Sequence, residues 1–531
     1  MRGIFLRENR EVPSSPRVGG TTPGRIGKAG GHTPMMHDGG NSDRPNVPTK
    51  LPNKAGRAAA EAAEGRGLAK GNTSQQNASR TQCRTSALSA LERVREAARR
   101  DRKAKFTALL HHVTIDRLRD AYLAPSRKAA AGVDGVTWPQ YGVGLEDNLR
   151  DLHARLHQGA YRAKPSRRVY IPKADGRQRP LGIAALEDKL VQRAVVEVLN
   201  AIYETDFLGF SYGFRPKRSQ HDALDALAVA IRTKKVKWVL DADVRGFFDA
   251  IDHGWLVKFF EHRIADRRML RLIQKWLSAG VLQNGLWTAS EEGTPQGATV
   301  SPLAGNVYLH YVLDLWVEQW RRRHAHGDVV IVRYADDFLV GFQHRAEADR
   351  FLLALRERFA KFSLELQADK TRLVEFGRFA ASNRAERGLG KPETFDFLGF
   401  THICGKTRDG RFMIRRRTVR KRMRAKLHEV KAELQRRRHD PIPEQGRWLG
   451  SVVRGHIAYY AVPTNMAGVR SFRTQVTQHW LRSLRQRSQK HRVTWARMNR
   501  LSNQWLPPAR LSHPLPDVRF GVRTQGKSPV R

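Results

Sequence analysis

Two adjacent carboxylates stand between two apolar runs in VVIVRYADDFLVGF, residues 329–342. The runs predict the two strands of a hairpin, with Asp336 and Asp337 at its turn. A third carboxylate, Asp243, lies in KWVLDADV, whose alternation predicts a strand with Asp241 and Asp243 on one face. Like charges that are buried together repel one another, so a cluster of this kind requires a compensating cation.

A divalent cation would provide that compensation. Mg²⁺ prefers hard oxygen ligands and commonly uses one or two carboxylates together with substrate phosphates. Two such ions about 4 Å apart can activate an attacking 3′-hydroxyl and stabilise a leaving pyrophosphate. This chemistry needs one carboxylate on a central strand and another at the tip of an adjacent hairpin, and the sequence contains both. The alternative for Asp336 and Asp337 is a surface turn with two solvated carboxylates.

The elements that would position these carboxylates are a mixture of strands and helices. The stretch RRVYIPKADGRQRPLGI predicts a hairpin with Asp175 and Gly176 at its turn, and ETFDFLGFTHI predicts one further strand. From about residue 411 the chain is expected to be helical and very basic. One apolar stripe there has helical spacing: Val419, Met423, Leu427, Val430 and Leu434. The whole pattern predicts an α+β fold rather than regular βαβ alternation.

The charge balance indicates the kind of partner. Lys and Arg number 96 against 51 Asp and Glu in 531 residues, which gives a formal net charge of +45. A folded protein this basic is expected to bind a polyanion, usually nucleic acid. Cys83 and Cys404 suggest no disulfide framework, and no apolar run approaches the roughly 20 residues that span a bilayer. We therefore expect a cytoplasmic protein with no membrane partner.

Seven sequence blocks together carry a family resemblance. In chain order they are RPLGI, SYGFRP, DADVRGFFDAIDH, GTPQGATVSPLAGNVYLHYVLD, YADD, LELQADKTR and FDFLGF. Their types and order resemble those of a reverse transcriptase, and more narrowly of the reverse transcriptase/maturase encoded by bacterial group II introns. YADD alone is a weak signal, whereas seven blocks in the correct order are a strong one. The resemblance covers roughly residues 88–505.

The resemblance implies a right-hand polymerase in which fingers and palm with an antiparallel sheet precede an all-α basic thumb, or maturase, domain. The expected segments are a disordered basic extension (1–80), N-terminal helices and fingers (81–235), palm (236–404), thumb (405–505) and a basic tail (506–531). Many members continue into an HNH endonuclease with paired Cys and His. The residues after Trp505 are few and lack Cys, so no endonuclease is expected.

The resemblance also implies roles for individual residues. Asp243, Asp336 and Asp337 match the catalytic carboxylates that bind two Mg²⁺ ions, with Mn²⁺ able to substitute. Asp337 is expected to contribute less directly than the other two. Tyr334 is expected to support the hairpin and pack beside the primer end. The residues that match the nucleotide-binding positions are Lys173, Arg179, Phe248, Gln296 and Lys370.

Phe248 matches the aromatic residue that blocks a ribose 2′-hydroxyl, although from sequence its neighbour Phe247 is a second candidate. Lys173 and Arg179 match cations that grip the triphosphate, Gln296 matches the residue under the nucleotide sugar, and Lys370 is a candidate phosphate contact.

The function implied is RNA-directed DNA synthesis on intron RNA for intron mobility, together with assistance to splicing. The partners would be intron RNA, a DNA primer or target, and dNTPs; the oligomeric state is open. Two alternatives remain: an RNA-binding splicing factor with an inactive polymerase site, and a reverse transcriptase of a retron or defence lineage. The complete carboxylate set argues against the first, and the basic helical region after the palm argues against the second. An RNA-dependent RNA polymerase is disfavoured by the bulky Phe248.

Overall fold

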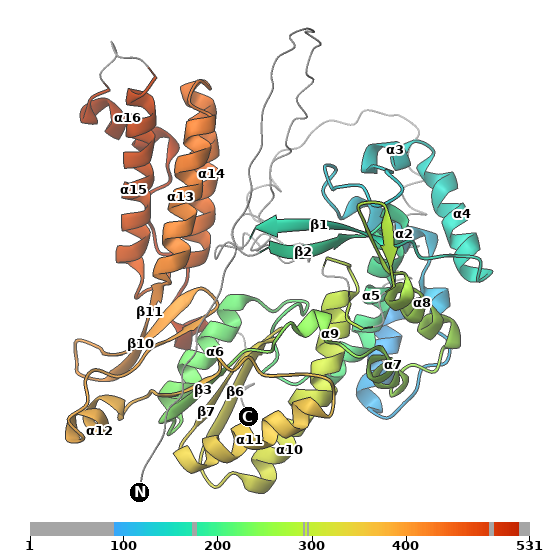
Figure 1. The fold of residues 1–531 in the computed structure, drawn as a ribbon, viewed down its shortest axis with the longest axis horizontal. Coiled ribbons are helices and arrows are strands. Elements are labelled where there is room, and N and C mark those ends of the chain that lie inside the picture. Colours follow the sequence, from blue (N-terminus) through green and yellow to red (C-terminus); the bar gives the residue numbers. More distant parts are fainter. Residues whose placement is uncertain (1–89, 173–177, 290–291, 295–296, 488–492, 520–531) are drawn as a thin grey trace, which may run out of the picture. The chain divides into compact units, whose positions relative to one another are not determined.

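The computed structural model describes residues 90–172, 178–289, 292–294, 297–487 and 493–519 (Figure 1). Within these residues, three β-sheets are combined with many helices, so the predicted α+β class is confirmed. The disorder expected for residues 1–80 falls outside the described residues. In the part of the chain that is described, no helix is long and apolar enough to cross a membrane.

The central sheet contains the predicted hairpin. Its strands, in spatial order, are β6 (Val329–Tyr334), β7 (Asp337–Phe342), β3 (Trp238–Ala242) and β8 (Arg372–Glu375). Every pairing in it is antiparallel. Strands β6 and β7 are joined by a two-residue turn, Ala335 and Asp336. The predicted hairpin is confirmed, but its turn lies one residue earlier than expected, because Asp337 begins β7 and pairs with Tyr334.

Both faces of the central sheet are buried. Leu240 and Ala242 lie in one core with helix α11 (Arg345–Ala360), whereas Val239 lies in a second core with helix α6 (Gln220–Thr233). The predicted alternation along β3 is therefore confirmed. A sheet covered on both faces is a rigid support for side chains that project from its edge.

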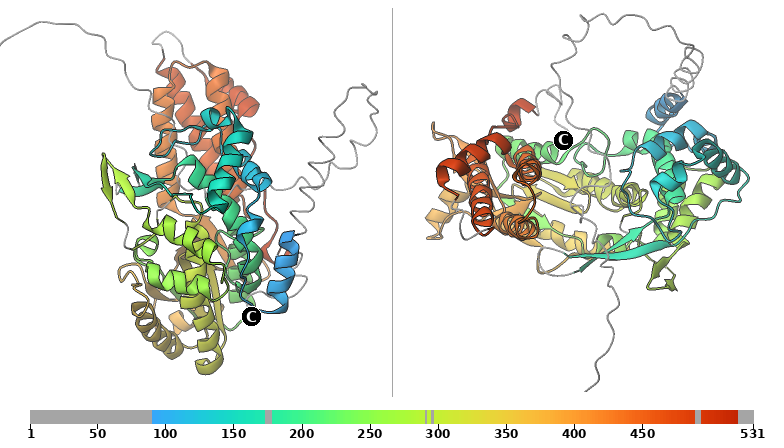
Figure 2. Two further views of the ribbon diagram at one scale, coloured as in Figure 1. Left: turned by 90° about the vertical axis from the view of Figure 1, so that its right-hand side faces the viewer. Right: turned by 90° about the horizontal axis from the view of Figure 1, so that it is seen from above.

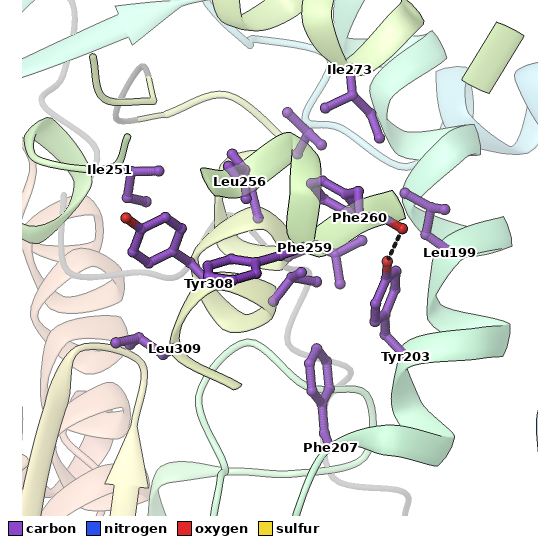
Figure 3. Close-up of a cluster of buried hydrophobic side chains, with 14 of the residues drawn as sticks. Leu199, Tyr203, Phe207, Ile251, Leu256, Phe259, Phe260, Ile273, Tyr308 and Leu309 are labelled. Atoms are coloured by element: carbon purple, nitrogen blue, oxygen red, sulfur yellow. Dashed lines mark hydrogen bonds between the residues drawn. The ribbon is translucent and has the colours of Figure 1, made fainter. Parts of the chain in front are cut away.

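The first core continues into a group of helices beside the sheet. Figure 3 shows aromatic side chains from several of them meeting there. The Tyr203 hydroxyl donates a hydrogen bond to the Phe260 carbonyl at 3.3 Å, which gives this buried phenol a partner (Figure 3). The helices in this group are α5 (Leu186–Asp206), α7 (His253–Glu261), α8 (Arg267–Ser278) and α9 (Ser301–Leu309).

A second sheet combines two strands that precede β3 in the chain with two that follow it. Its order is β2-β1-β4-β5, and the bounds are β1 (Ser166–Pro172), β2 (Gln178–Ile183), β4 (Val281–Gln283) and β5 (Leu286–Thr288). The β1–β2 hairpin is confirmed, while its predicted turn at residues 175 and 176 lies outside the described residues. Strands β1 and β4 pair in parallel, so this sheet is not wholly antiparallel as expected.

Two predictions for the region of the third sheet were wrong. The single strand expected in ETFDFLGFTHI is two strands, β9 (Phe395–Phe397) and β10 (Phe400–Lys406), because Leu398 and Gly399 both take positive φ and reverse the chain. Residues Phe412–Thr418 form β11, where a helix was expected, so the region from 405 is not all-α. The reason is that basic residues conceal the strand's alternation: Arg416 is buried, whereas its neighbours Arg415 and Arg417 are exposed.

The basic helices begin at Arg420. The predicted apolar stripe is confirmed for Leu427, Val430 and Leu434, which are buried in a core of their own. Met423 packs against this core. Figure 2 shows these helices running alongside one another. They are α13 (Arg420–Arg436), α14 (Ile442–Tyr460), α15 (Met466–Arg485) and α16 (Trp495–Trp505).

Besides the helical residues 90–100 and 516–519, further helices of the described residues connect these parts. They are α2 (Ile115–Leu123), α3 (Trp138–Gly142), α4 (Leu145–His157), α10 (Leu315–His324), α12 (Ala380–Glu386), two short 3₁₀ turns (Leu110–His112, Phe247–Asp249) and a π-helical turn (His310–Asp314) between α9 and α10.

Candidate catalytic site

The three predicted carboxylates meet at one edge of the central sheet. Asp243 follows β3 directly, Asp336 occupies the β6–β7 turn, and Asp337 is the first residue of β7. Strands β3 and β7 are neighbours, and Ala242 pairs with Phe338, so Asp243 and Asp337 lie at the same end of the two strands. The backbone of Asp243 is also fixed, because its carbonyl accepts a 2.8 Å hydrogen bond from the Gln367 amide.

The carboxylates influence one another electrostatically. Burial raises the pKa of Asp337 to about 8, with further increases from Asp336, Asp241 and Asp243. Burial also raises the pKa of Asp336, and Asp243 adds to this effect, whereas Arg179 and Arg333 oppose it. Ionising all three carboxylates together therefore costs free energy, and a bound cation would remove that cost.

Two of the predicted nucleotide-binding cations face this cluster. The Lys370 ammonium donates a hydrogen bond to the Asp243 carboxylate, so it partly neutralises the site. Arg179, on β2, lowers the pKa of Asp336. A third cation, Arg422 at the start of α13, lowers the pKa of Asp337 and was not foreseen from the sequence.

Asp241 adds to the local charge from within β3. Burial raises its pKa to about 6, against the opposing effect of Arg372, whose guanidinium lies 3.6 Å from the Asp241 carboxylate. Asp241 therefore lies in the same electrostatic group as Asp337.

The two candidate gate residues differ in exposure. Phe247 is 3% exposed and belongs to the core, whereas Phe248 is only partly buried and packs against that core. Both rings lie against Gly305 of α9: a β-carbon there would stand 3.0 Å from Phe247 and 3.1 Å from Phe248. The Phe248 carbonyl accepts a 2.7 Å hydrogen bond from the Thr294 amide, which fixes the backbone of this turn. Exposure therefore favours Phe248 over Phe247 as the ring that a ligand can touch.

The remaining predicted residues divide into two groups. Lys173 and Gln296 lie outside the described residues. Tyr334 is half-buried, packs at the margin of the second core, and has its ring centre 6.5 Å from that of Phe214. Burial raises the pKa of Tyr334 to about 12, so its hydroxyl stays protonated at neutral pH.

A buried polar network beneath the hairpin turn was not predicted. Arg333 of β6 is 0% exposed and donates to both carboxylate oxygens of Asp314, from Nε at 2.7 Å and from Nη2 at 2.5 Å. Its Nη1 donates to the Asn306 side-chain oxygen at 3.0 Å and to the Ala335 carbonyl at 2.9 Å. Ala335 has φ of +57°, a conformation that costs a residue other than glycine roughly 1 kcal/mol or more. The network therefore holds the strained turn that presents Asp336.

The SYGFRP segment closes over the same turn. The Tyr212 amide donates to the Arg333 carbonyl at 2.8 Å, and the Asn306 amide group donates to the Gly213 carbonyl at 2.8 Å. A β-carbon on Gly213 would lie 2.1 Å from the Ala335 nitrogen, so only glycine fits. A sequence signal for this support did exist, because Arg333 interrupts an otherwise apolar strand and a charge there needs a buried partner.

Whether the site can bind metal ions depends on which side-chain oxygens it offers as ligands. In the described residues, no three His, Cys, Asp or Glu side chains form a ready-made metal-binding group. Carboxylate oxygens with raised pKa values at one sheet edge nevertheless suit Mg²⁺, which commonly takes one or two protein carboxylates and completes its shell with substrate phosphate. The residues present therefore fit a cation that arrives with a nucleotide.

Comparison with known proteins agrees with this geometry. Residues 171–402 match the family model described as "Reverse transcriptase (RNA-dependent DNA polymerase)". That match contains the carboxylates, both phenylalanines and the buried network. A group II intron-encoded protein, LtrA of Lactococcus lactis subsp. cremoris, is 40% identical over 179 residues, which are 34% of this chain and 29% of LtrA. The chain thus carries a region similar to reverse transcriptases and resembles group II intron-encoded proteins.

The chain is also similar to two further proteins. Protein YkfC of Escherichia coli strain K12 is 37% identical over 253 residues, which are 41% of this chain and 66% of YkfC. An uncharacterised 91 kDa protein in the cob intron of Schizosaccharomyces pombe is 43% identical over 172 residues, which are 32% of this chain and 21% of that protein. The matches thus span less than two thirds of each relative's length.

Proposed function

We propose that this chain is an RNA-directed DNA polymerase that copies group II intron RNA into cDNA for intron mobility and assists the splicing of that RNA as a maturase. The observation that carries the proposal is the meeting of Asp243, Asp336 and Asp337 at one edge of a sheet that is buried on both faces. The name of LtrA, a group II intron-encoded protein, supports the intron association.

In this proposal, residues 81–235 comprise the N-terminal helices and fingers, residues 236–404 the palm, and residues 405–505 the thumb. Strands β10 and β11 then form the base of the thumb, and helices α13–α16 form its body. A cytoplasmic location stays a prediction.

The proposed mechanism assigns each site residue a task. Two Mg²⁺ ions, or Mn²⁺ in their place, would supply Lewis-acid stabilisation of the phosphate charge when bound by Asp243 and Asp336, with Asp337 contributing less directly. Arg179 and Lys173 would grip the triphosphate. Lys370 would exchange its contact with Asp243 for a phosphate oxygen.

The sugar and the primer would be held by the remaining residues. Phe248 would place a flat ring where a ribose 2′-hydroxyl would sit, and Gln296 would lie under the sugar. Tyr334 would pack beside the primer end and support the hairpin. The Arg333 network would keep Asp336 in position, so that the carboxylates need not reorganise during the reaction.

The maturase role would use the basic surface of the thumb helices. The N-terminal end of α13 exposes several of its cations, and the helix buries its apolar stripe on the other side: the exposed residues are Arg420, Lys421, Arg422 and Arg424. Such a surface suits the backbone of folded RNA, whose recognition rests on shape, phosphate and unpaired bases.

Primer extension on an RNA template with Mg²⁺ tests the polymerase. The wild type should extend with dNTPs, and the Asp336→Asn, Asp337→Asn double variant should not, while both bind RNA equally. Asp349→Asn, on the exposed face of α11, is the matched control and should retain full activity. A folded wild type that binds RNA but does not extend would instead favour a splicing factor with an inactive polymerase site.

Intron splicing at low Mg²⁺ tests the maturase role. Splicing that proceeds equally with and without the protein would remove this half of the proposal.

A further inference from the structure

The segment that follows α16, residues 507–519, returns from the thumb helices to α6 beside the central sheet. From the sequence, these residues were expected to form part of a basic tail. At its start, the Pro507 carbonyl accepts a 3.1 Å hydrogen bond from Arg473 of α15. The Ser512 amide donates to the Ala461 carbonyl at 3.1 Å. The segment is thus attached to the helices that we assign to the thumb.

His513 joins the two sides. One ring nitrogen lies 2.7 Å from the Ala458 carbonyl of α14, and the ring stacks on His221 of α6 with centres 3.7 Å apart. His221 is 7% exposed, and burial lowers its pKa to about 2, with His513 adding to the effect. Burial lowers the pKa of His513 as well, so both members of the stack favour the neutral ring, which limits repulsion between them.

The end of the segment is fixed to α6 by ion pairs. Arg519 Nε lies 3.0 Å from an Asp225 carboxylate oxygen, and the other oxygen accepts a 2.9 Å hydrogen bond from Arg416 of β11. Asp225 is 1% exposed, so these guanidinium groups compensate a buried charge. Asp517 also pairs with Arg232 near the end of α6.

We infer that residues 507–519 are a strap that fixes the thumb helices against α6, and that Arg519 and His513 are positioning residues for processive DNA synthesis. This inference rests on the proposed polymerase function. A thumb that is fixed to α6, which packs on the central sheet, keeps the template–primer duplex in register between successive additions. Loosening the strap should therefore increase dissociation of the duplex without changing the addition of one nucleotide, because the strap contacts none of the three catalytic carboxylates.

The test compares Arg519→Ala with Arg510→Ala in the full chain. Both changes remove one positive charge from the same segment, but Arg510 is exposed and Arg519 is nearly buried, so the comparison separates the contact from the charge. In a single-round extension assay with a trap, Arg519→Ala should shorten the mean product about fivefold; the loss is limited because the buried Asp225 keeps its second guanidinium partner, Arg416. Its single-nucleotide rate should stay near wild type, and Arg519→Lys should restore part of the length.

Hydrogen exchange provides a readout that does not depend on polymerase activity. Arg519→Ala should speed exchange in α6 and around Ala458, whereas Arg510→Ala should not. If the wild type does not polymerise, the proposed function fails while exchange still tests the strap.

Asp517→Asn, which breaks a separate contact, should act in the same direction if Arg519→Ala proves unstable. Equal product lengths and equal exchange rates for Arg519→Ala and Arg510→Ala would overturn the strap. If Arg519→Ala lowered the single-nucleotide rate as much as the product length, the link between the strap and processivity would be overturned.

Discussion

Arg333 and Asp314 form a fully buried, bidentate ion pair directly beneath the catalytic hairpin turn. Asp314 ends the π-helical turn between α9 and α10, and Arg333 stands two residues before Ala335 in the chain. π-Helical turns occur frequently at functional sites, and here one places a carboxylate where it can hold the strand of the hairpin. The geometry of the catalytic turn thus depends on a helical residue that lies 19 positions before Arg333 in the sequence.

Removing Arg333 should strongly destabilise the protein. Arg333→Met leaves Asp314 buried without its partner, a change that costs about 3–5 kcal/mol. Chemical denaturation measures this loss. The exposed pair of Arg345 and Asp349 is the control, and Arg345→Met should change stability by about 0.5 kcal/mol or less. Replacing Arg333 and Asp314 together by Met and Leu should cost less than Arg333→Met alone; a larger cost would mean that the unpaired carboxylate is not the source of the loss.

Gly213→Ala should displace the catalytic turn. The new β-carbon would collide with the Ala335 backbone, which must then move together with Asp336. We expect a loss of catalytic rate of about a hundredfold, since misplacement of reacting groups by about 1 Å has this effect. Gly455→Ala in α14 is the control, because nothing lies within 4 Å of a β-carbon there. Single-nucleotide incorporation measures both, and equal rates would show that the turn tolerates the change.

Metal binding should depend on pH through Asp337. Its pKa of about 8 means that, without metal, the folded protein retains the proton at neutral pH, and a cation must displace it. Apparent Mg²⁺ affinity should therefore increase with pH by up to about tenfold per unit until about pH 8, then level off. The same raised pKa makes folded-state stability without metal fall as pH rises from the unfolded value toward 8.

Calorimetry of Mg²⁺ binding, with template–primer and a non-reactive dNTP analogue, measures this dependence. Asp337→Asn should flatten it. A wild-type affinity that does not change between about pH 6.5 and pH 8.5 would contradict the protonated state of Asp337.

Phe248→Ala should relax sugar selection. Loss of the ring should lower discrimination against rNTPs by about 10- to 100-fold, the range expected for steric contacts in a pocket. Phe247→Leu changes a core residue and should reduce stability while leaving discrimination unchanged. Competition between dNTP and rNTP incorporation measures both. If Phe247→Leu alters discrimination and Phe248→Ala does not, the two roles are exchanged.

The catalytic edge could be predicted from the sequence because its signals are local. Asp243 follows an alternating strand, and the two aspartates stand between apolar runs, so each element was visible on its own. The Arg333 network was missed because Asp314, Asn306 and Gly213 come from separate segments that only the fold brings together. Strand β11 was missed because Arg416, a buried residue in a basic run, resembles its exposed neighbours until its partner Asp225 is known.

Single-nucleotide incorporation by Asp243→Asn tests the central claim most directly. Asp243 directly follows β3, outside the hairpin, so its loss tests whether the carboxylates at the ends of β3 and β7 act as one site. On an RNA template with Mg²⁺, we expect the wild type to add a dNTP and Asp243→Asn to lose at least about a thousandfold in rate, with RNA binding unchanged. Incorporation by Asp243→Asn at the wild-type rate would contradict the assignment of this sheet edge as the polymerase site.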